Sequence, residues 1–85
     1  MKTSTFFALM AEYSTASVEL DKVCEKYFGL KPPEAAKRAN LNRLPVPTFR
    51  CGTQKSAFMV HVEDLANLID AQREKALEQW QKMNG

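Results

Sequence analysis

The strongest constraint on the fold of this chain is a break near its middle, in the run FGLKPP. Gly29 stands where a helix commonly ends, because glycine adopts the left-handed conformation at little cost. Pro32 and Pro33 cannot continue a preceding helix, yet their fixed φ angle suits the first turn of a new one. The break therefore predicts a helix over residues 20–28, a tight turn, and a second, short helix over residues 33–41.

The two helices on either side of this break differ in character. The first carries one apolar stripe that must face a core, formed by Leu20, Val23, Cys24, Tyr27 and Phe28. The second is short because Asn42 stands near its end and Pro45 just beyond. Its residues Ala35 and Ala39 share a face and predict close packing on the first helix. The helical period puts on the opposite face Pro33, Lys37 and Asn40, with Glu34 and Leu41 beside them and Arg38 at the boundary.

The remaining segments complete a small fold. TSTFFALMAEY predicts a short amphipathic helix, and the turn-rich STASVEL predicts a link. Two short strands, 48–51 and 57–62, flank GTQKS, which favours a hairpin with Gln54, Lys55 and Ser56 at its tip. From Glu63 a long helix runs to about residue 83. We therefore expect one domain over residues 1–85, mainly α with a small β-hairpin and a long C-terminal helix.

Charge is distributed unevenly along the chain, although its formal net value is only +2. Residues 1–34 hold four cations and five acids, and residues 63–85 hold three cations and five acids. The segment between them, residues 35–62, holds five cations and no acid. A solvated basic surface is one explanation of this excess, and a nucleic-acid partner is the other. The order of helix, turn, basic helix and basic hairpin favours duplex DNA, because it is the order of a winged helix-turn-helix.

Several classes of protein are disfavoured by the composition. No apolar run approaches the roughly 20 residues of a membrane-spanning helix, and no secretory signal pattern is present, so we expect a cytoplasmic protein without a membrane partner. Cys24 and Cys51, with a single histidine in the chain, suggest neither a zinc site nor a disulfide, and both are expected to be reduced core thiols. We expect no metal and no cofactor. His61 has no arrangement of Ser or Cys suited to nucleophilic catalysis, so no enzyme is predicted.

The order of these segments also resembles known families. GLKPPEAAKRANLNRLPVPTFR, followed by a hairpin and EDLANLID, resembles the winged DNA-binding domains of the MerR and phage-excisionase class. FFALMAEY, VCEKYFGL, AAKRANLNRLPVPTFR and QKSAFMVHVEDLANLIDAQR together are similar to the pyocin activator (PrtN) family, over nearly the whole chain to about Arg73. That resemblance implies a prophage-linked transcriptional activator. Such a protein binds upstream of bacteriocin or late phage genes and turns them on when a DNA-damage response removes a repressor.

Candidate DNA-contacting residues follow from this organisation. Lys37 and Asn40 are expected to face the major groove, where Lys can donate to guanine and Asn can pair with adenine. Asn40 facing only water is the alternative. Phosphate contacts are expected from Lys31, Arg38, Arg43, Arg50 and Lys55, with help from Gln54 and Ser56 at the wing. The helix positions Pro33 and Glu34 complete the predicted DNA-binding set.

The long final helix predicts a second surface. About 20 helical residues span roughly 30 Å, which exceeds what a small core can cover. A stripe that continues past the core is formed by Gln72, Ala76, Trp80 and Met83, and we expect a homodimer contact there. A frayed tail with Trp80 folded back is the alternative.

Other functions remain compatible with the same residues. An excisionase-like factor that bends DNA would use the same surfaces, as would a repressor. A phage adaptor protein could instead dock a host regulator through the C-terminal stripe. An activator in the bacterial nucleoid would also meet RNA polymerase.

Overall fold

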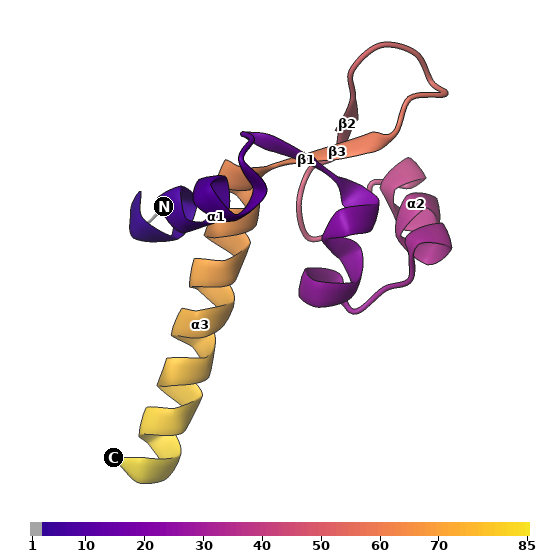
Figure 1. The fold of residues 1–85 in the computed structure, drawn as a ribbon. Helices are drawn as coiled ribbons and strands as arrows, with labels where there is room; N and C mark the ends of the chain where they lie inside the picture. Colours follow the sequence, from indigo (N-terminus) through magenta and orange to yellow (C-terminus); the bar gives the residue numbers. More distant parts are fainter. Residues whose placement is uncertain (1–2) are drawn as a thin grey trace.

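A small antiparallel sheet stands at the centre of the computed structural model, which describes residues 3–85. Its middle strand is β3 (Phe58–His61), with β1 (Ser17–Glu19) on one side and β2 (Phe49–Arg50) on the other. Val18 pairs with Val60, and Arg50 pairs with Phe58. Figure 1 shows the helices below this sheet and the loop between β2 and β3 above it.

The strand β1 corrects the sequence-based prediction, which read STASVEL as a link and expected only a two-stranded hairpin. Val18 is buried and opposite Val60, which is fully buried. A three-residue strand is too short to show a periodic pattern, and its hydrogen-bond partner lies about 40 residues further along the chain. The predicted hairpin itself is confirmed, with shorter strands.

Two helices flank the sheet and pack on each other. The first is α1 (Thr3–Tyr13), as predicted from TSTFFALMAEY. The other is α3 (Val62–Asn84), which begins one residue before the predicted Glu63. Thr5 Oγ1 donates a hydrogen bond to Asp70 Oδ1 at 2.7 Å and so joins these two helices across 65 positions of sequence.

The helix expected over residues 20–28 is instead two short helical pieces of different kinds. A 3₁₀ turn, η1 (Leu20–Lys22), is followed by a π-helical segment, η2 (Cys24–Phe28). Between them Val23 departs from helical geometry, with φ −122° and ψ −12°. Val23 and Cys24 are fully buried, so packing beneath the sheet decides the path of this segment more than helix propensity does.

The break that the sequence predicted is present. Gly29 adopts the left-handed conformation at φ 68° and ψ 26°. The N–H groups of Gly29 and Leu30 return to the carbonyl oxygens of Glu25 and Cys24, at 3.2 and 3.1 Å, and so satisfy the end of η2. The next helix, α2, spans Pro32–Asn40, one residue earlier than expected at each end.

The core lies where these elements meet. Its buried residues are Leu9, Val18, Leu20, Val23, Cys24, Ala35, Ala39, Val46, Val60, Val62, Leu65 and Ala66. The predicted packing of Ala35 and Ala39 is therefore confirmed, and so is the burial of Cys24. The prediction for Cys51 is wrong: this cysteine is free and exposed, because it follows β2 into the loop above the sheet rather than pointing beneath it.

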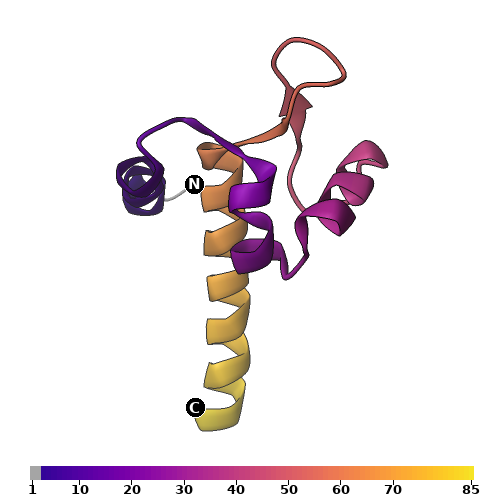
Figure 2. The ribbon, with the colours of Figure 1, turned by 45° about the vertical axis from the view of Figure 1, so that its right-hand side comes forward.

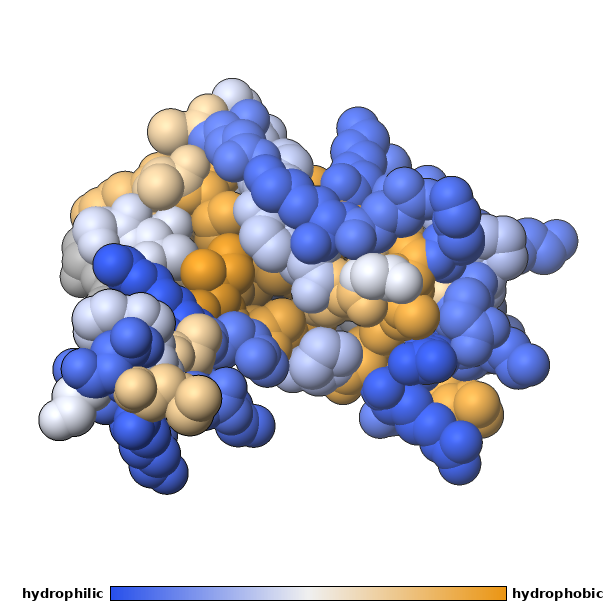
Figure 3. All heavy atoms as spheres, turned by 90° about the horizontal axis from the view of Figure 1, so that it is seen from below, coloured by the Kyte–Doolittle hydropathy of each residue, from blue (hydrophilic) through white to orange (hydrophobic). Residues whose placement is uncertain are grey.

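The far half of α3 extends beyond the rest of the molecule, whose principal extents are 51 × 26 × 16 Å. Figures 1 and 2 both show this half pointing away from every other element, and residues 71–85 are all exposed. Seen from below, hydrophilic residues cover much of the surface, and apolar surface lies exposed between them (Figure 3). Within residues 3–85, none of the helices has both the length and the apolar character needed to cross a membrane.

Candidate nucleic-acid interface

The outward face of α2 carries the cations that the helical period predicted. Lys37 is exposed there, opposite the buried Ala35 and Ala39. An open hollow of about 400 Å³ on this face is lined by Glu34, Lys37, Arg38, Leu41 and Arg43. Asn42, at φ 53°, turns the chain after the helix, and the N–H of Arg43 donates to the carbonyl oxygen of Arg38 at 2.9 Å. This turn brings Arg43 back beside the helix that it follows.

Some of these cations have acidic neighbours and others have none. Arg38 Nε lies 3.3 Å from Glu34 Oε1, and Lys31 Nζ lies 3.4 Å from Glu25 Oε1. Both ion pairs are exposed, so solvent weakens them and a stronger anion could replace the carboxylate. Lys37, Arg43 and Lys55 form no ion pair with any residue in the described part of the chain.

The loop between β2 and β3 is closed by a turn at its tip. The N–H of Ser56 donates to the carbonyl oxygen of Thr53 at 3.0 Å, and the N–H of Thr53 donates to Ser56 Oγ at 3.2 Å. The N–H of Lys55 also donates to Thr53 Oγ1. Gly52, at φ 116°, supplies a backbone conformation that other residues adopt only with strain. Gln54 and Lys55 are therefore exposed at the centre of an ordered turn.

Arg50 lies at the base of this loop and contacts the protein itself. Its guanidinium carbon is 3.9 Å from the centre of the Phe58 ring, on the neighbouring strand. Its terminal nitrogen donates to the carbonyl oxygen of Gln54. Its Nε is buried and has no hydrogen-bond partner among the described residues.

A second hollow, of about 320 Å³, separates α2 from the loop. Its lining comes from three parts of the chain: Leu20, Asp21, Pro32, Ala36, Asn40, Arg50, Ser56, Ala57 and Phe58. Asn40 thus faces the loop side, in company with Arg50 and Ser56, whereas Lys37 belongs to the outer hollow. The predicted residues that line these hollows are thus divided between them, whereas Lys31, Pro33, Gln54 and Lys55 line neither.

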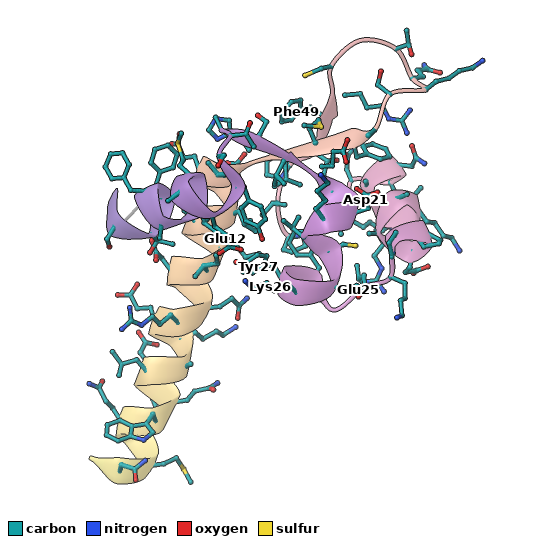
Figure 4. The ribbon with its side chains drawn as sticks, viewed as in Figure 1. Glu12, Asp21, Glu25, Lys26, Tyr27 and Phe49 are labelled. Carbon is teal, nitrogen blue, oxygen red and sulfur yellow. The ribbon has the colours of Figure 1, made fainter. Side chains whose placement is uncertain are left out.

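A polar cluster ties α1 to η2 and so holds the element that supports α2. Lys26 Nζ lies 3.4 Å from Glu12 Oε2 and 5.2 Å from the centre of the Tyr27 ring (Figure 4). Hydrogen bonding and electrostatic interaction with Tyr27, followed by the same two interactions with Glu12, raise the pKa of Lys26. Burial is the main cause that raises the pKa of Tyr13 well above its ordinary range, with Glu12 and Tyr27 adding to it.

The stripe predicted on α3 is exposed along the protruding half of the helix. Trp80 is 61% exposed and Met83 86%. Leu77, at 50%, was missed by the sequence analysis, and it lies beside Ala76 and Trp80 in an open hollow of about 500 Å³. Gln72 and Ala76 are also exposed. This half of the helix thus presents an apolar surface to solvent.

Two contributions to the loop were missed in the sequence. Thr53 organises the tip through its backbone and hydroxyl, and the spacing of Thr53 and Ser56 after a glycine is a turn signal that could have revealed it. Arg50 was expected to reach out to a phosphate, because a strand residue next to a loop gives no sign of a contact with the loop backbone.

Comparison with known proteins adds one finding. The model of the pyocin activator protein PrtN family matches residues 5–76, from α1 into the second half of α3. No curated protein and no solved structure matches the chain significantly.

Proposed function

This chain belongs to the pyocin activator protein PrtN family, and from that premise we propose that it is a DNA-binding transcriptional activator of pyocin or late prophage genes. The observation that carries the proposal is the cationic surface formed by α2 and the loop between β2 and β3. It comes from a segment, residues 35–62, with five cations and no acid. Such a surface suits the phosphate backbone of a duplex.

We assign the fold to the winged helix-turn-helix type. In this assignment η1 and η2 are the first helix, Gly29 to Lys31 the turn, and α2 the recognition helix. The loop between β2 and β3 is the wing. The left-handed Gly29 supports this assignment, because a tight turn between two short helices is the defining feature of the motif.

In the proposed complex, α2 enters the major groove with its outward face. Lys37 reaches base edges there, and Asn40 lies on the flank that faces the wing. Pro33 and Glu34 stand in the first turn of the helix, and the exposed Glu34 carboxylate, 3.3 Å from Arg38 Nε, gives way to a phosphate in the complex. Phosphates are contacted by Lys31, Arg38 and Arg43 around α2, and by Lys55 at the wing, next to Gln54 and Ser56.

A selection from a randomised duplex library tests DNA binding without a known operator. We expect the purified protein to enrich a sequence, and the double variant K37E/R43E to bind the enriched duplex at least tenfold more weakly. The control K75E/K82E reverses two exposed lysines on the far half of α3 and makes the same change in net charge. Equal binding by the wild type and K37E/R43E would remove α2 from the interface.

We also propose that the chain acts as a homodimer through the far half of α3. Leu77, Trp80 and Met83 leave apolar surface exposed there, and Gln72 and Ala76 extend the same stripe toward the core. A two-fold dimer would place two copies of α2 on paired half-sites. Burying the Trp80 ring against a partner removes large apolar area from water.

Light scattering tests the dimer. Trp80→Glu is expected to give a monomer mass at concentrations where the wild type gives a dimer. Gln81→Glu, which adds the same charge one residue further along, is the control. A dimer mass retained by Trp80→Glu would exclude this residue from the contact, and a monomeric wild type would remove the dimer proposal altogether.

Genome-wide mapping of bound sites distinguishes the regulatory roles. Binding beside bacteriocin or late phage genes, with loss of their transcription on deletion, supports activation. A single bound attachment site would point to an excisionase-like role. No bound site, together with capture of a host regulator or RNA polymerase alone, would point to an adaptor.

A further inference from the structure

The starting point is the setting of Arg50, a half-buried cation that contacts the chain itself. Its guanidinium lies over the Phe58 ring at 3.9 Å, and its Nε is buried without a hydrogen-bond partner in the described part of the chain. Buried polar atoms are nearly always paired, so an exception calls for a reason. The position of Arg50 is set by its other contacts.

Those contacts join the sheet to the tip of the loop. Arg50 and Phe58 are opposite each other in the last pair of β2 and β3 before the loop begins. From there the terminal nitrogen of Arg50 reaches the carbonyl oxygen of Gln54. Gln54 is one of the two central residues of the turn that Thr53 and Ser56 close. One side chain thus links the end of the sheet to the exposed part of the turn.

We propose that Arg50 is a positioning residue, which holds the turn of Gln54 and Lys55 at a set angle to α2 before DNA binds. This inference rests on the proposed function, in which Lys55 contacts a phosphate. A loop that is already ordered loses less conformational entropy on binding than a loose one. Arg50 and Asn40 both line the hollow between α2 and the loop, so the side chain that would position the loop also borders α2.

A phosphate contact by Arg50 itself is the competing assignment, and the geometry disfavours it. The planar guanidinium already uses one face on an aromatic ring and one edge on a backbone carbonyl. Lys55, by contrast, is exposed and without an ion pair among residues 3–85. The loop therefore has one cation for its own structure and one for a ligand.

Replacing Arg50 by Lys separates the two roles, because the charge stays while the planar fork is lost. We expect Arg50→Lys to weaken binding to the enriched duplex about tenfold, equivalent to about 1.4 kcal/mol. Phe58→Leu, which removes the ring but no charge, is expected to have a similar effect. The control Arg73→Lys, at an exposed site on the far half of α3, should bind within about twofold of the wild type. Thermal melting checks that each variant remains folded.

Lys55 supplies the second arm of the experiment. If Arg50 acts through Lys55, then Arg50→Lys should weaken binding far less when Lys55 is already alanine. If Arg50 instead contacts a phosphate itself, Arg50→Lys should bind as well as the wild type. Such a contact also predicts that Arg50→Ala lowers the slope of log affinity against log salt by about 0.9, whether residue 55 is lysine or alanine. Either of these two results would overturn the positioning role.

A measurement without DNA keeps the inference separate from the proposed function. Backbone order parameters of Gln54, Lys55 and Ser56 in the free protein should be close to the rigid value of about 0.85. In Arg50→Lys they should fall toward about 0.6. Failure of the wild type to enrich any duplex, with this change still present, would remove DNA binding but leave Arg50 as the support of the loop. Unchanged order parameters would overturn the inference even if DNA is bound.

Discussion

His61 Nδ1 accepts a hydrogen bond from the backbone N–H of Glu63 at 3.0 Å, so the last residue of β3 is also the N-cap of α3. The sequence around His61 suggested no catalytic role for this residue. The cap gives His61 a structural role, because its ring accepts a hydrogen bond from a backbone N–H that has no partner within the helix. Strand and helix are thereby joined without an intervening loop.

Removing this cap should destabilise the fold. His61→Ala is expected to lower the free energy of unfolding by about 0.5 to 2 kcal/mol, and His61→Asn should restore most of the loss because its side-chain oxygen can accept the same bond. Urea denaturation followed by circular dichroism measures both variants. An alanine variant as stable as the wild type would show that the cap contributes nothing.

The hydrogen bond from Thr5 to Asp70 should hold α1 on α3. Thr5→Val keeps the shape of the side chain but removes the donor to a charged acceptor, and it should cost about 1.5 to 3 kcal/mol. Thr5→Ser keeps the hydroxyl and serves as the control. Denaturant midpoints provide the comparison, and the prediction fails if valine and serine variants unfold together.

Alkaline pH should destabilise the protein through Tyr13. Its pKa is raised in the folded state above the ordinary 10.0, mainly by burial, so the fold binds this proton more tightly than the unfolded chain does. The resulting stability is fully present below pH 10 and is lost as pH rises beyond it. The urea concentration at the unfolding midpoint should therefore fall less steeply between pH 8 and pH 11 for Tyr13→Phe than for the wild type. The pKa of Lys26 is also raised in the folded state, so its deprotonation destabilises the fold at alkaline pH as well. Part of the fall in the urea midpoint with pH should therefore remain in Tyr13→Phe.

Binding to the enriched duplex should weaken steeply with salt. Four phosphate contacts, from Lys31, Arg38, Arg43 and Lys55, predict a slope of log affinity against log salt of about −3.6, and a fifth would make it about −4.5. Removing one such cation, as in Arg43→Ala, should reduce the slope by about 0.9. Fluorescence anisotropy at a series of salt concentrations measures it, and a slope near zero would reject the electrostatic basis of the interface.

Local signals explain why much of the fold could be predicted. Gly29 and the prolines after it act within a few residues, so the turn and the start of α2 were found within one position. The period of Ala35 and Ala39 likewise gave the buried face of α2. The strand β1 was missed because Val18 becomes a strand residue only when Val60 pairs with it.

In the candidate interface, too, some residues could be predicted from local sequence pattern and others only from the tertiary structure. Lys37 follows from the period of one helix, and the structure leaves it exposed on the expected face. Arg50 could not be assigned from sequence, because its contacts with Phe58 and Gln54 depend on how the two strands align and how the loop folds back. Cys51 was misplaced because the general tendency of cysteine to be buried does not show where β2 ends and the exposed loop begins.

By itself the sequence determined where the chain breaks, which faces of its helices are apolar, and that its central segment is basic. These properties depend on neighbours a few positions apart, through backbone geometry and the helical period. Tertiary structure alone decided that β1 joins the sheet, that residues 20–28 form a 3₁₀ turn and a π-helical segment, and that Arg50 contacts Phe58 and the loop. Those outcomes depend on contacts between distant segments, which burial and hydrogen bonding select only after the chain has folded.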